Sequence, residues 1–143
     1  MTSDTGVLDV DALFEAAAAV RERAYAPYSQ FKVGAAIRGA GGGLHVGCNV
    51  ENAAYPSGTC AEEAAIAAMI AAGETRIAAI AVLGSGDTPV TPCGACRQRI
   101  REFGAPTTAI HAGCAGGARR SLVLEGLLPH AFGPDLLARA AEP

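Results

Sequence analysis

The chain has few large aromatic side chains and no apolar run long enough to cross a membrane. It contains no tryptophan, and only 5% of its 143 residues are aromatic. The longest apolar run, Ala64 to Ala72, is far shorter than the roughly 18 residues that a membrane-spanning helix needs. Because 50% of the residues are still hydrophobic, largely through alanine, the chain can bury a closely packed core. We expect one domain over residues 1–143, with residues 1–8 as a flexible end.

An excess of basic residues is also missing. The formal net charge is −3 and the estimated pI is about 5.5, whereas a protein that grips nucleic acid presents a basic face to the phosphates. The densest basic run contains Arg97, Arg99 and Arg101, which do not share one helix face because successive residues turn by about 100°. We interpret this run as a solvated surface, and we expect neither a nucleic acid nor a membrane as partner.

The N-terminal sequence MTSDTGVLDVD lacks the apolar stretch of a secretory signal. We therefore expect a cytoplasmic protein, in which disulfides are uncommon. The five cysteines, at positions 48, 60, 93, 96 and 114, are then better explained by metal binding or catalysis than by a disulfide framework.

Hydrophobic periodicity and turn residues predict an α-β-β-α-β-α-β-β order of elements. This order implies a mixed sheet with helices packed on it. The predicted elements are a helix from Asp9 or Asp11 to about Ala24, a hairpin of strands 31–38 and 44–50, a helix over 60–72, a buried strand over 77–83, a helix over 92–103, and strands over 107–112 and 121–124, followed by a tail that is irregular or briefly helical.

Two short segments place cysteines at the predicted starts of helices. They are Thr59-Cys60-Ala61-Glu62 and Thr91-Pro92-Cys93-Gly94-Ala95-Cys96, in which Thr59 and Thr91 are the candidate N-caps. Unpaired N–H groups and the positive end of a helix dipole stabilise a thiolate at such a position and lower the pKa of the thiol. Two such helix ends facing each other would hold three thiolates together.

Three protein ligands are typical of a catalytic zinc ion, which keeps its fourth position open for water. Zinc lowers the pKa of that water, and a nearby carboxylate that is not a ligand can carry the proton. Glu62 lies two residues after Cys60 and is the candidate for this role. The sequence therefore predicts Zn²⁺ as a cofactor, bound by Cys60, Cys93 and Cys96.

Each segment also has a purely structural interpretation. Thr59 and Glu62 have the spacing of a capping box, and a C-x-x-C pair can be a redox pair or half of a structural zinc site. Cys48 and Cys114 are small buried hydrophobes or, alternatively, fourth ligands of a closed site. Taken together, C-x-E followed some thirty residues later by P-C-x-x-C matches the zinc deaminase signature, with cysteine in place of the first histidine.

The chain resembles the small zinc-dependent cytidine deaminases of the homotetrameric type. The resemblance runs from Ala24 to about Leu136 and rests on the stretches AYAPYSQFKVGAA, VGCNVENAAYPSGTCAEEAAI, PCGACRQ and LLPHAFGP. It implies a three-layer α-β-α fold with a mixed five-stranded sheet and helices on both faces. The implied reaction, part of pyrimidine salvage, is the hydrolysis of cytidine or deoxycytidine to uridine or deoxyuridine plus ammonia.

The resemblance also implies roles for single residues. Cys60, Cys93 and Cys96 match the zinc ligands, and Glu62 matches the glutamate that carries protons from water to ring N3 and to the leaving amine. The matches that concern the substrate are Asn49 and Glu51 at the ribose, Phe31 packed at the nucleoside, the backbone around Ala61 at the pyrimidine edge, and Phe132 reaching into a neighbouring subunit's site. Such shared sites would make a homotetramer part of the mechanism.

One position departs from the family pattern. Many members carry arginine directly after the glutamate, whereas this chain has Glu63. Zinc with three thiolates has a formal charge of about −1, which makes it a poorer acidifier of water than a site with histidine. Our hypothesis is that the helix N-termini and Arg97 compensate for this charge.

Three other functions are compatible with parts of the pattern. A deaminase of a modified aminonucleoside would share the zinc site but differ around the sugar, where the intact NVEN sequence favours an ordinary nucleoside. A non-catalytic, zinc-stabilised binding module would close its site with Cys48 or Cys114. Nucleic-acid editing would require the basic, aromatic-lined surface that this chain lacks.

Overall fold

The computed structural model describes residues 9–140, so the predicted flexible segment 1–8 lies outside the described residues. The first element is helix α1 (Val10–Arg21), whose N-cap Asp9 accepts a hydrogen bond from the N–H of Ala12 at 3.1 Å. The helix ends before the predicted Ala24, because the N–H groups of Arg23 and Ala24 bond to carbonyls only three residues back.

Strands β1 (Gly34–Gly39) and β2 (Leu44–Cys48) form the predicted antiparallel hairpin. The predicted start of the first strand at Phe31 is wrong. The side-chain amide of Asn49 accepts a bond from the N–H of Val33 at 2.9 Å and donates one to the carbonyl of Phe31 at 2.8 Å. A side chain therefore takes the place that a neighbouring strand would occupy at these residues.

The remaining elements follow the predicted order. They are α2 (Ala61–Ala71), β3 (Ile77–Gly84), α3 (Gly94–Phe103), β4 (Ala109–Cys114) and β5 (Arg119–Val123). Gly73, with φ of +94°, follows the end of α2, as expected for a glycine just past a helix. Three short helices complete the described chain, namely the 3₁₀ helix η1 (Tyr55–Ser57), α4 (Leu124–Leu127) and α5 (Pro134–Ala140).

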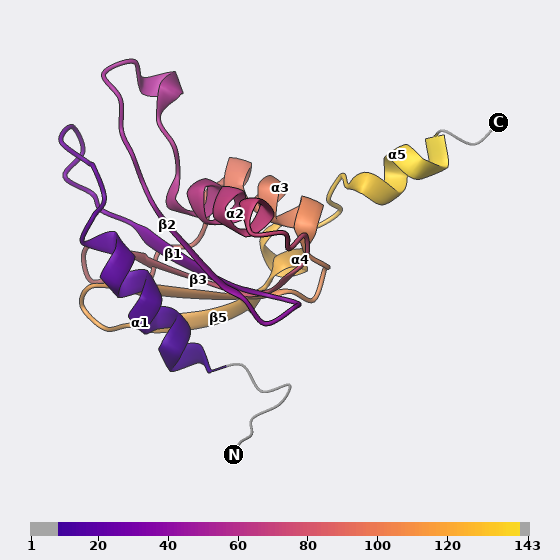
Figure 1. The fold of residues 1–143 in the computed structure, drawn as a ribbon, viewed down its shortest axis with the longest axis horizontal. Helices are drawn as coiled ribbons and strands as arrows, with labels where there is room; N and C mark the ends of the chain where they lie inside the picture. Colours follow the sequence, from indigo (N-terminus) through magenta and orange to yellow (C-terminus); the bar gives the residue numbers. More distant parts are fainter. Residues whose placement is uncertain (1–8, 141–143) are drawn as a thin grey trace.

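The five strands form one mixed sheet in the order β2-β1-β3-β4-β5. Strands β3 and β4 are parallel and the other neighbouring pairs are antiparallel. Helix α1 covers one face of the sheet, and α2 and α3 cover the other (Figure 1). The expected three-layer α-β-α arrangement is confirmed, whereas the extent of the domain over all 143 residues stays a prediction.

Side chains that alternate along the central strands divide the core into two parts. Ile37 and Ile80 face α2 and α3, and they pack in a cluster with Met69 and Ile100. The opposite face presents small residues, which pack against α1 and are Ala36, Ala79 and Ala81. Alanine on this face lets α1 lie close to the sheet, which explains how a chain with few aromatics builds a dense core.

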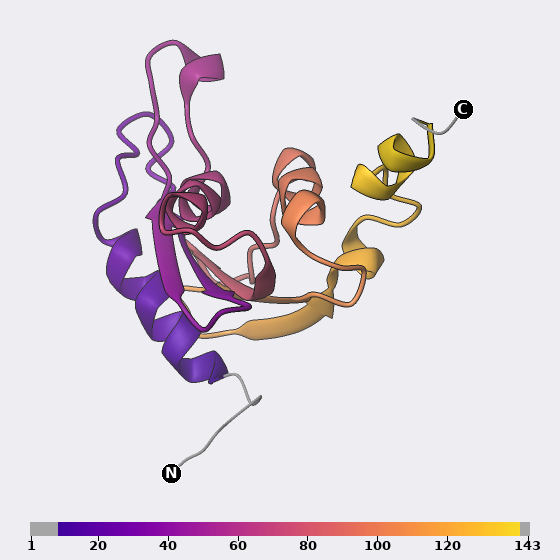
Figure 2. The same ribbon diagram turned by 45° about the vertical axis from the view of Figure 1, so that its right-hand side comes forward.

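The segment that follows β2 leaves the sheet and joins two loops together. Val50 pairs with Tyr25 on one side and with Thr59, just before α2, on the other. The loop that contains η1 extends beyond the sheet on the same side as the loop after α1, whereas α5 extends away from the sheet (Figures 1 and 2). None of the helices within residues 9–140 has the length and apolar character needed to cross a membrane.

Candidate metal centre and active site

The N-cap of α2 lies one residue later than predicted, and this shift gives Glu62 and Glu63 different roles. The N-cap is Cys60, not Thr59, and the capping-box acid is Glu63, not Glu62. The Glu63 carboxylate accepts a hydrogen bond from the N–H of Cys60 at 3.3 Å. Since Glu63 satisfies the helix end, Glu62 has no capping duty.

The start of α3 is shifted in the same direction. Its N-cap is Cys93 rather than Thr91, and the first helical residue is Gly94 rather than Pro92. The N–H of Arg97 bonds to the carbonyl of Cys93 at 2.9 Å, which closes the first turn. One cysteine is therefore the N-cap of each helix, and Cys96 lies in the first turn of the second one.

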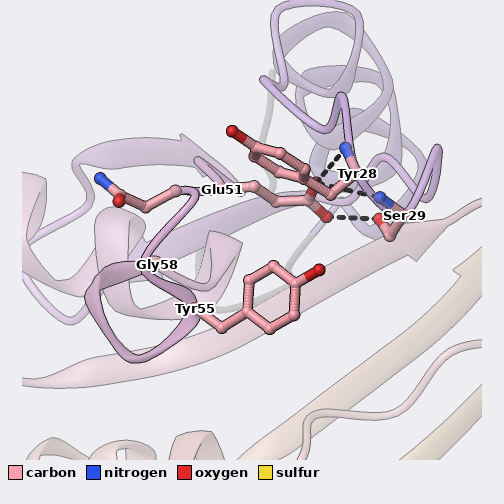
Figure 3. Close-up of a pocket in the computed structure, with 6 residues that line it drawn as sticks. Tyr28, Ser29, Glu51, Tyr55 and Gly58 are labelled. Carbon is pink, nitrogen blue, oxygen red and sulfur yellow. Dashed lines mark hydrogen bonds between the residues drawn. The ribbon is translucent and has the colours of Figure 1, made fainter.

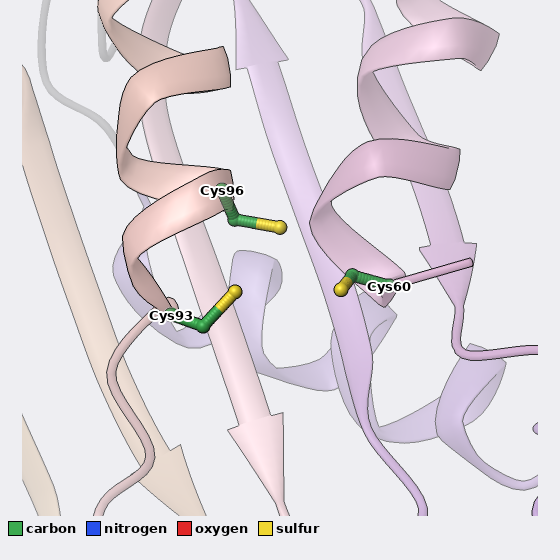
Figure 4. Close-up of side chains that lie close together, drawn as sticks. All are labelled: Cys60, Cys93 and Cys96. Carbon is green, nitrogen blue, oxygen red and sulfur yellow. The ribbon is translucent and has the colours of Figure 1, made fainter. Parts of the chain in front are cut away.

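The sulfur atoms of Cys60, Cys93 and Cys96 lie within 4.8 Å of one another. Figure 4 shows the three side chains pointing toward a common centre, one from the start of α2 and two from the start of α3. Neither Cys48 nor Cys114 belongs to this group, which has three members within residues 9–140. The Cys114 thiol instead faces the carbonyl of Ala118 at 3.6 Å. A closed four-cysteine site made with either residue is therefore not formed.

The three thiols differ in acidity. Burial raises the pKa of Cys60 and of Cys96, and the acidic neighbours add to this effect at Cys96. The pKa of Cys93 is lowered, chiefly by a hydrogen bond from the backbone N–H of Cys96. Backbone N–H groups at a helix N-terminus thus lower the pKa of Cys93, whereas burial dominates at Cys60 and Cys96. A divalent cation between the sulfurs is what would allow all three to ionise together.

This donor set fits zinc. Zn–S bonds of about 2.3 Å in a tetrahedral site would place sulfur ligands about 3.8 Å apart, and the three sulfurs here all lie within 4.8 Å of one another, so small side-chain shifts would suffice. Thiolates are preferred ligands of zinc over magnesium or calcium. Cys60 and Cys93 also line a cavity, so a fourth ligand position would open toward a space that a small molecule can enter. This arrangement is typical of a catalytic rather than a structural zinc site.

Glu62 lies at the same cavity with its side chain almost fully buried, at 5% exposure. Burial raises the pKa of its carboxyl group above the ordinary value, although its own backbone N–H and the charge of Arg99 counteract part of this effect. A carboxyl group whose pKa lies closer to neutrality exchanges protons more readily at physiological pH. The position and environment of Glu62 therefore suit a proton carrier.

The cavity beside the cysteines has a volume of about 360 Å³, which is sufficient for a small molecule. It brings together residues from four separate segments of the chain. Of the predicted site residues, the cavity is lined by Asn49, Glu51, Cys60, Ala61, Glu62 and Cys93. Its other lining residues, which the sequence did not indicate, include Val33, Tyr55 and Val90. Val33 and Val90 resemble ordinary core residues, and only tertiary structure places them here.

Glu51 also lines a second, adjoining cavity of about 370 Å³ (Figure 3). One carboxylate oxygen accepts bonds from the N–H groups of Tyr28 and Ser29, and the other accepts a bond from the Ser29 hydroxyl. The Ser29 hydroxyl is the main cause of a lowered pKa at Glu51, so this group is a carboxylate at neutral pH. It is held rigidly as an acceptor at the mouth of the site. Asn49, next to it, retains unused hydrogen-bonding capacity because its amide oxygen and nitrogen each make one bond.

The two predicted phenylalanines lie elsewhere. Phe31 is 40% exposed, and its ring lies beside Gly84 without lining the cavity of the cysteines. Phe132 is 55% exposed, and its backbone carbonyl accepts a bond from the side chain of Gln98. Within one chain, neither ring is part of the site.

Arg97 is directed away from the sulfurs. Its guanidinium donates to the carbonyl of Pro92 at 2.7 Å, to that of Leu127 at 2.8 Å, and to the Thr91 hydroxyl at 3.1 Å. These contacts do not support the hypothesis that Arg97 compensates for the thiolate charge. The guanidinium that meets a thiol belongs to Arg99, at 3.5 Å from the Cys96 sulfur. The signal for it was the spacing of three residues from Cys96, which places both side chains on one helix face.

Comparison with known proteins agrees with this geometry. Residues 9–112 match the family model described as the cytidine and deoxycytidylate deaminase zinc-binding region. A cytidine deaminase of Sporosarcina psychrophila is 39% identical over 94% of this chain and 99% of its own length. One from Halalkalibacterium halodurans is also 39% identical, over 87% of this chain and 95% of its own.

Solved structures lead to the same family. The crystal structure of a cytidine deaminase from Burkholderia pseudomallei superposes with a TM-score of 0.83 at 48% identity, over 87% of this chain and 100% of that one. The cytidine deaminase of Mycobacterium tuberculosis gives a TM-score of 0.77 at 35% identity, over 89% and 99% of the two chains. With its three-cysteine centre, its fold and these relatives, the chain belongs to the cytidine and deoxycytidylate deaminase zinc-binding family.

Proposed function

We propose that this protein hydrolytically deaminates cytidine and deoxycytidine to uridine and deoxyuridine, with Cys60, Cys93 and Cys96 as zinc ligands and Glu62 as the proton carrier. The observation that carries the proposal is a cluster of three thiols beside one cavity, which Cys60, Cys93 and the buried carboxyl group of Glu62 line. Family membership gives the reaction class, because the relatives are cytidine deaminases.

In the reaction, a C4–O bond forms and the C4–N bond of the pyrimidine breaks. When bound, zinc supplies a water molecule that is acidic enough to react near neutral pH. Glu62 accepts a proton from the attacking water and gives it to ring N3. It then takes a second proton, from the hydroxyl now bonded to C4, and delivers it to the amine, which leaves as ammonia while the C4 oxygen becomes the carbonyl of the product. The raised pKa of Glu62 favours both directions of transfer, since the group must be base and acid in turn.

The polar groups at the mouth of the cavity provide a place for the sugar. Glu51 is an ionised acceptor, and Asn49 has a free donor and a free acceptor position. We assign the ribose hydroxyls to these two residues and the pyrimidine edge to the backbone at Ala61, which lies at the start of α2 beside Cys60. A site that pairs with hydroxyls discriminates strongly against analogues without them.

A homotetramer with shared sites is the second part of the proposal. The C-terminal helix α5 extends away from the sheet (Figure 2). This C-terminal region carries exposed apolar side chains. Phe132 and Leu137 are 55% and 62% exposed. In the tetramer, a neighbouring subunit would bury these side chains, and Phe132 would reach the cavity of that neighbouring subunit. Phe31 would complete the nucleoside pocket. The cytoplasmic location stays a prediction.

An ultraviolet assay of the purified protein tests the reaction. We expect turnover of cytidine and deoxycytidine, loss of turnover after zinc is removed with a chelator, and recovery when zinc is restored. A panel with free cytosine and modified aminonucleosides separates the alternatives. Turnover of a modified aminonucleoside without turnover of cytidine or deoxycytidine would contradict the proposed substrate but retain the chemistry.

A further inference from the structure

The acidic residue beside Glu62 belongs to a link between the two helices that carry the thiols. One oxygen of Glu63 accepts the bond from the N–H of Cys60 at 3.3 Å, and the other lies 3.4 Å from the Arg99 guanidinium. A second nitrogen of that guanidinium lies 3.5 Å from the Cys96 sulfur. The contacts therefore run from the backbone of one cysteine, through one ion pair, to the sulfur of another.

This link lies outside the cavity proposed for the nucleoside. Neither Glu63 nor Arg99 lines that cavity, and both line a separate hollow between α2 and α3. Any effect of Arg99 on the reaction must then act through the cysteines or through its charge near Glu62 rather than through contact with the substrate. Arg99 is in this sense a positioning residue.

The net negative charge of the three-cysteine centre would be offset by a nearby cation such as Arg99. Three thiolates on a divalent cation leave a net negative charge, and the carboxyl group of Glu62 lies beside them. Hydrogen bonds to coordinating sulfurs orient them and reduce the charge that they carry. The guanidinium of Arg97 is bonded to backbone carbonyls and to Thr91. Within residues 9–140, the cation that contacts a site sulfur is Arg99.

Glu63 is needed because the Arg99 side chain is long and 38% exposed. Without an anchor, such a side chain samples many conformations in solvent and spends less time near the sulfur. The carboxylate of Glu63 is itself fixed by the end of α2, so it holds the guanidinium on the side of Cys96. An acid next to Glu62 thus strengthens the placement of a cation at the centre.

We propose that Arg99, anchored by Glu63, donates a hydrogen bond to the Cys96 thiolate, offsets part of the thiolate charge and slows the release of zinc. The inference rests on the proposed function of the three cysteines as zinc ligands. It assigns to a residue of α3 the compensating charge that the chain lacks at position 63.

The test is the rate at which zinc passes from the folded protein to a chromogenic chelator. Arg99→Met keeps much of the side-chain length and removes the charge, and we expect release to be about tenfold faster or more. Arg101→Met is the matched control, because Arg101 lies on the same helix and pairs with Asp135 at 2.9 Å, away from the thiols. Its release rate should equal that of the wild type.

Two further variants separate charge from packing. Arg99→Lys should restore slow release in part, and Glu63→Gln should give an intermediate rate, because glutamine retains an acceptor for Cys60 but loses the ion pair. In the cobalt-substituted protein, the thiolate-to-metal charge-transfer band should shift in Arg99→Met and stay unchanged in Arg101→Met. If Arg99→Met does not fold, the rates of Arg99→Lys and Glu63→Gln decide.

Equal release from Arg99→Met and Arg101→Met would overturn the inference, as would wild-type release from both Arg99→Lys and Glu63→Gln. Zinc release requires no substrate. A wild-type protein that fails to convert cytidine but shows these differences would therefore refute the proposed reaction and leave this inference intact.

Discussion

Two adjacent carboxyl groups at the start of α2 have different surroundings, and this difference separates their roles. Glu62 is buried at the cavity beside the cysteines, whereas Glu63 caps the helix and pairs with Arg99. One step of about 100° around the helix axis is enough to direct the two side chains into different hollows, Glu62 into the cavity beside the cysteines and Glu63 into the hollow between α2 and α3. Because Glu63 satisfies the helix end, Glu62 is left free for proton transfer.

At the residue scale, Asn49 should be needed for stability as well as for substrate binding. Asn49→Ala removes the bonds to the N–H of Val33 and to the carbonyl of Phe31. Because these backbone groups then lose their partners, we expect the free energy of unfolding to fall by about 1–3 kcal/mol, as measured by urea denaturation. The KM for cytidine should rise in the same variant.

Asn52→Ala is the control, since Asn52 is exposed and its side chain bonds only within its own loop, to the N–H of Ala54. It should leave the unfolding free energy nearly unchanged. An Asn49→Ala protein with wild-type stability and KM would contradict both roles.

The sequence predicted the three cysteines and Glu62 as a group but not their partners. Ligand spacing within Cys93-x-x-Cys96 and the position of Glu62 are local properties, which a pattern can show. The observed N-caps, Cys60 and Cys93, lie one and two positions after the predicted threonines. The contact between Arg99 and Cys96 depends on a rotamer that Glu63 holds from another helix, and a linear sequence does not contain that information.

At the scale of elements, Gly47 determines how closely α2 approaches β2. A Cβ atom at Gly47 would lie 2.4 Å from the backbone nitrogen of Ala65 and 2.7 Å from the carbonyl oxygen of Ala61. These are backbone atoms, so the helix itself would have to move. We expect Gly47→Ala to lower the free energy of unfolding by about 1–3 kcal/mol and to speed zinc release, because the displaced helix carries Cys60.

Gly126→Ala is a suitable comparison, because a Cβ atom there meets nothing within 4 Å. Both variants can be measured by urea denaturation and by zinc transfer to a chelator. If Gly47→Ala behaved like Gly126→Ala, the close approach of α2 to β2 would not govern the position of Cys60.

Glu74, which follows α2, bonds to the turn between β1 and β2 and to His45 of β2, and its contribution to the stability of the fold depends on pH. Glu74 accepts bonds from His45 and from the N–H of Gly41, both at 2.7 Å. The bond with His45 is the main reason why the pKa of Glu74 lies below its ordinary value of 4.5. A carboxyl group whose pKa is lowered in the folded state stabilises the fold above its unfolded pKa, and this stabilisation disappears as the pH falls through the folded pKa.

We therefore expect Glu74→Gln to be less stable than the wild type at pH 7, with the difference decreasing below about pH 4.5 and disappearing at still lower pH. Urea midpoints measured stepwise over this range check the trend. The exposed Glu15 of α1 provides the control variant Glu15→Gln. A stability difference that stayed constant down to acid pH would show that Glu74 does not act through its charge.

The order of the elements could be predicted because hydrophobic patterns and turn glycines are local features of the sequence. The continuous run in β3 and the turn between β1 and β2 are examples. The ends of strands were less predictable. Residues 31–33 have the composition of a strand, but the Asn49 side chain bonds to their backbone in place of a neighbouring strand.

At the scale of the whole molecule, the C-terminal segment should be functional only in an oligomer. Light scattering should show a tetramer. Phe132→Ala should lower kcat/KM for cytidine by about tenfold, since a large aromatic at an interface usually carries much of the contact energy. Zinc content should be unchanged, because Phe132 is not one of the clustered thiol residues and does not line the cavity beside them in its own chain.

Val123→Ala, at an exposed position of β5, is the matched control and should retain full activity. A fully active monomer, or an unchanged kcat/KM in Phe132→Ala, would contradict shared active sites.

A zinc centre of three cysteines and one proton-carrying carboxyl group form the catalytic unit. This pairing is tested most directly by measuring cytidine turnover and bound zinc in the same preparations of wild type and Glu62→Gln. We expect both proteins to hold one zinc per chain, and kcat of the variant to fall by about 10²–10⁴-fold because proton transfer is lost. A Glu62→Gln protein that holds zinc and converts cytidine at the wild-type rate would contradict the account.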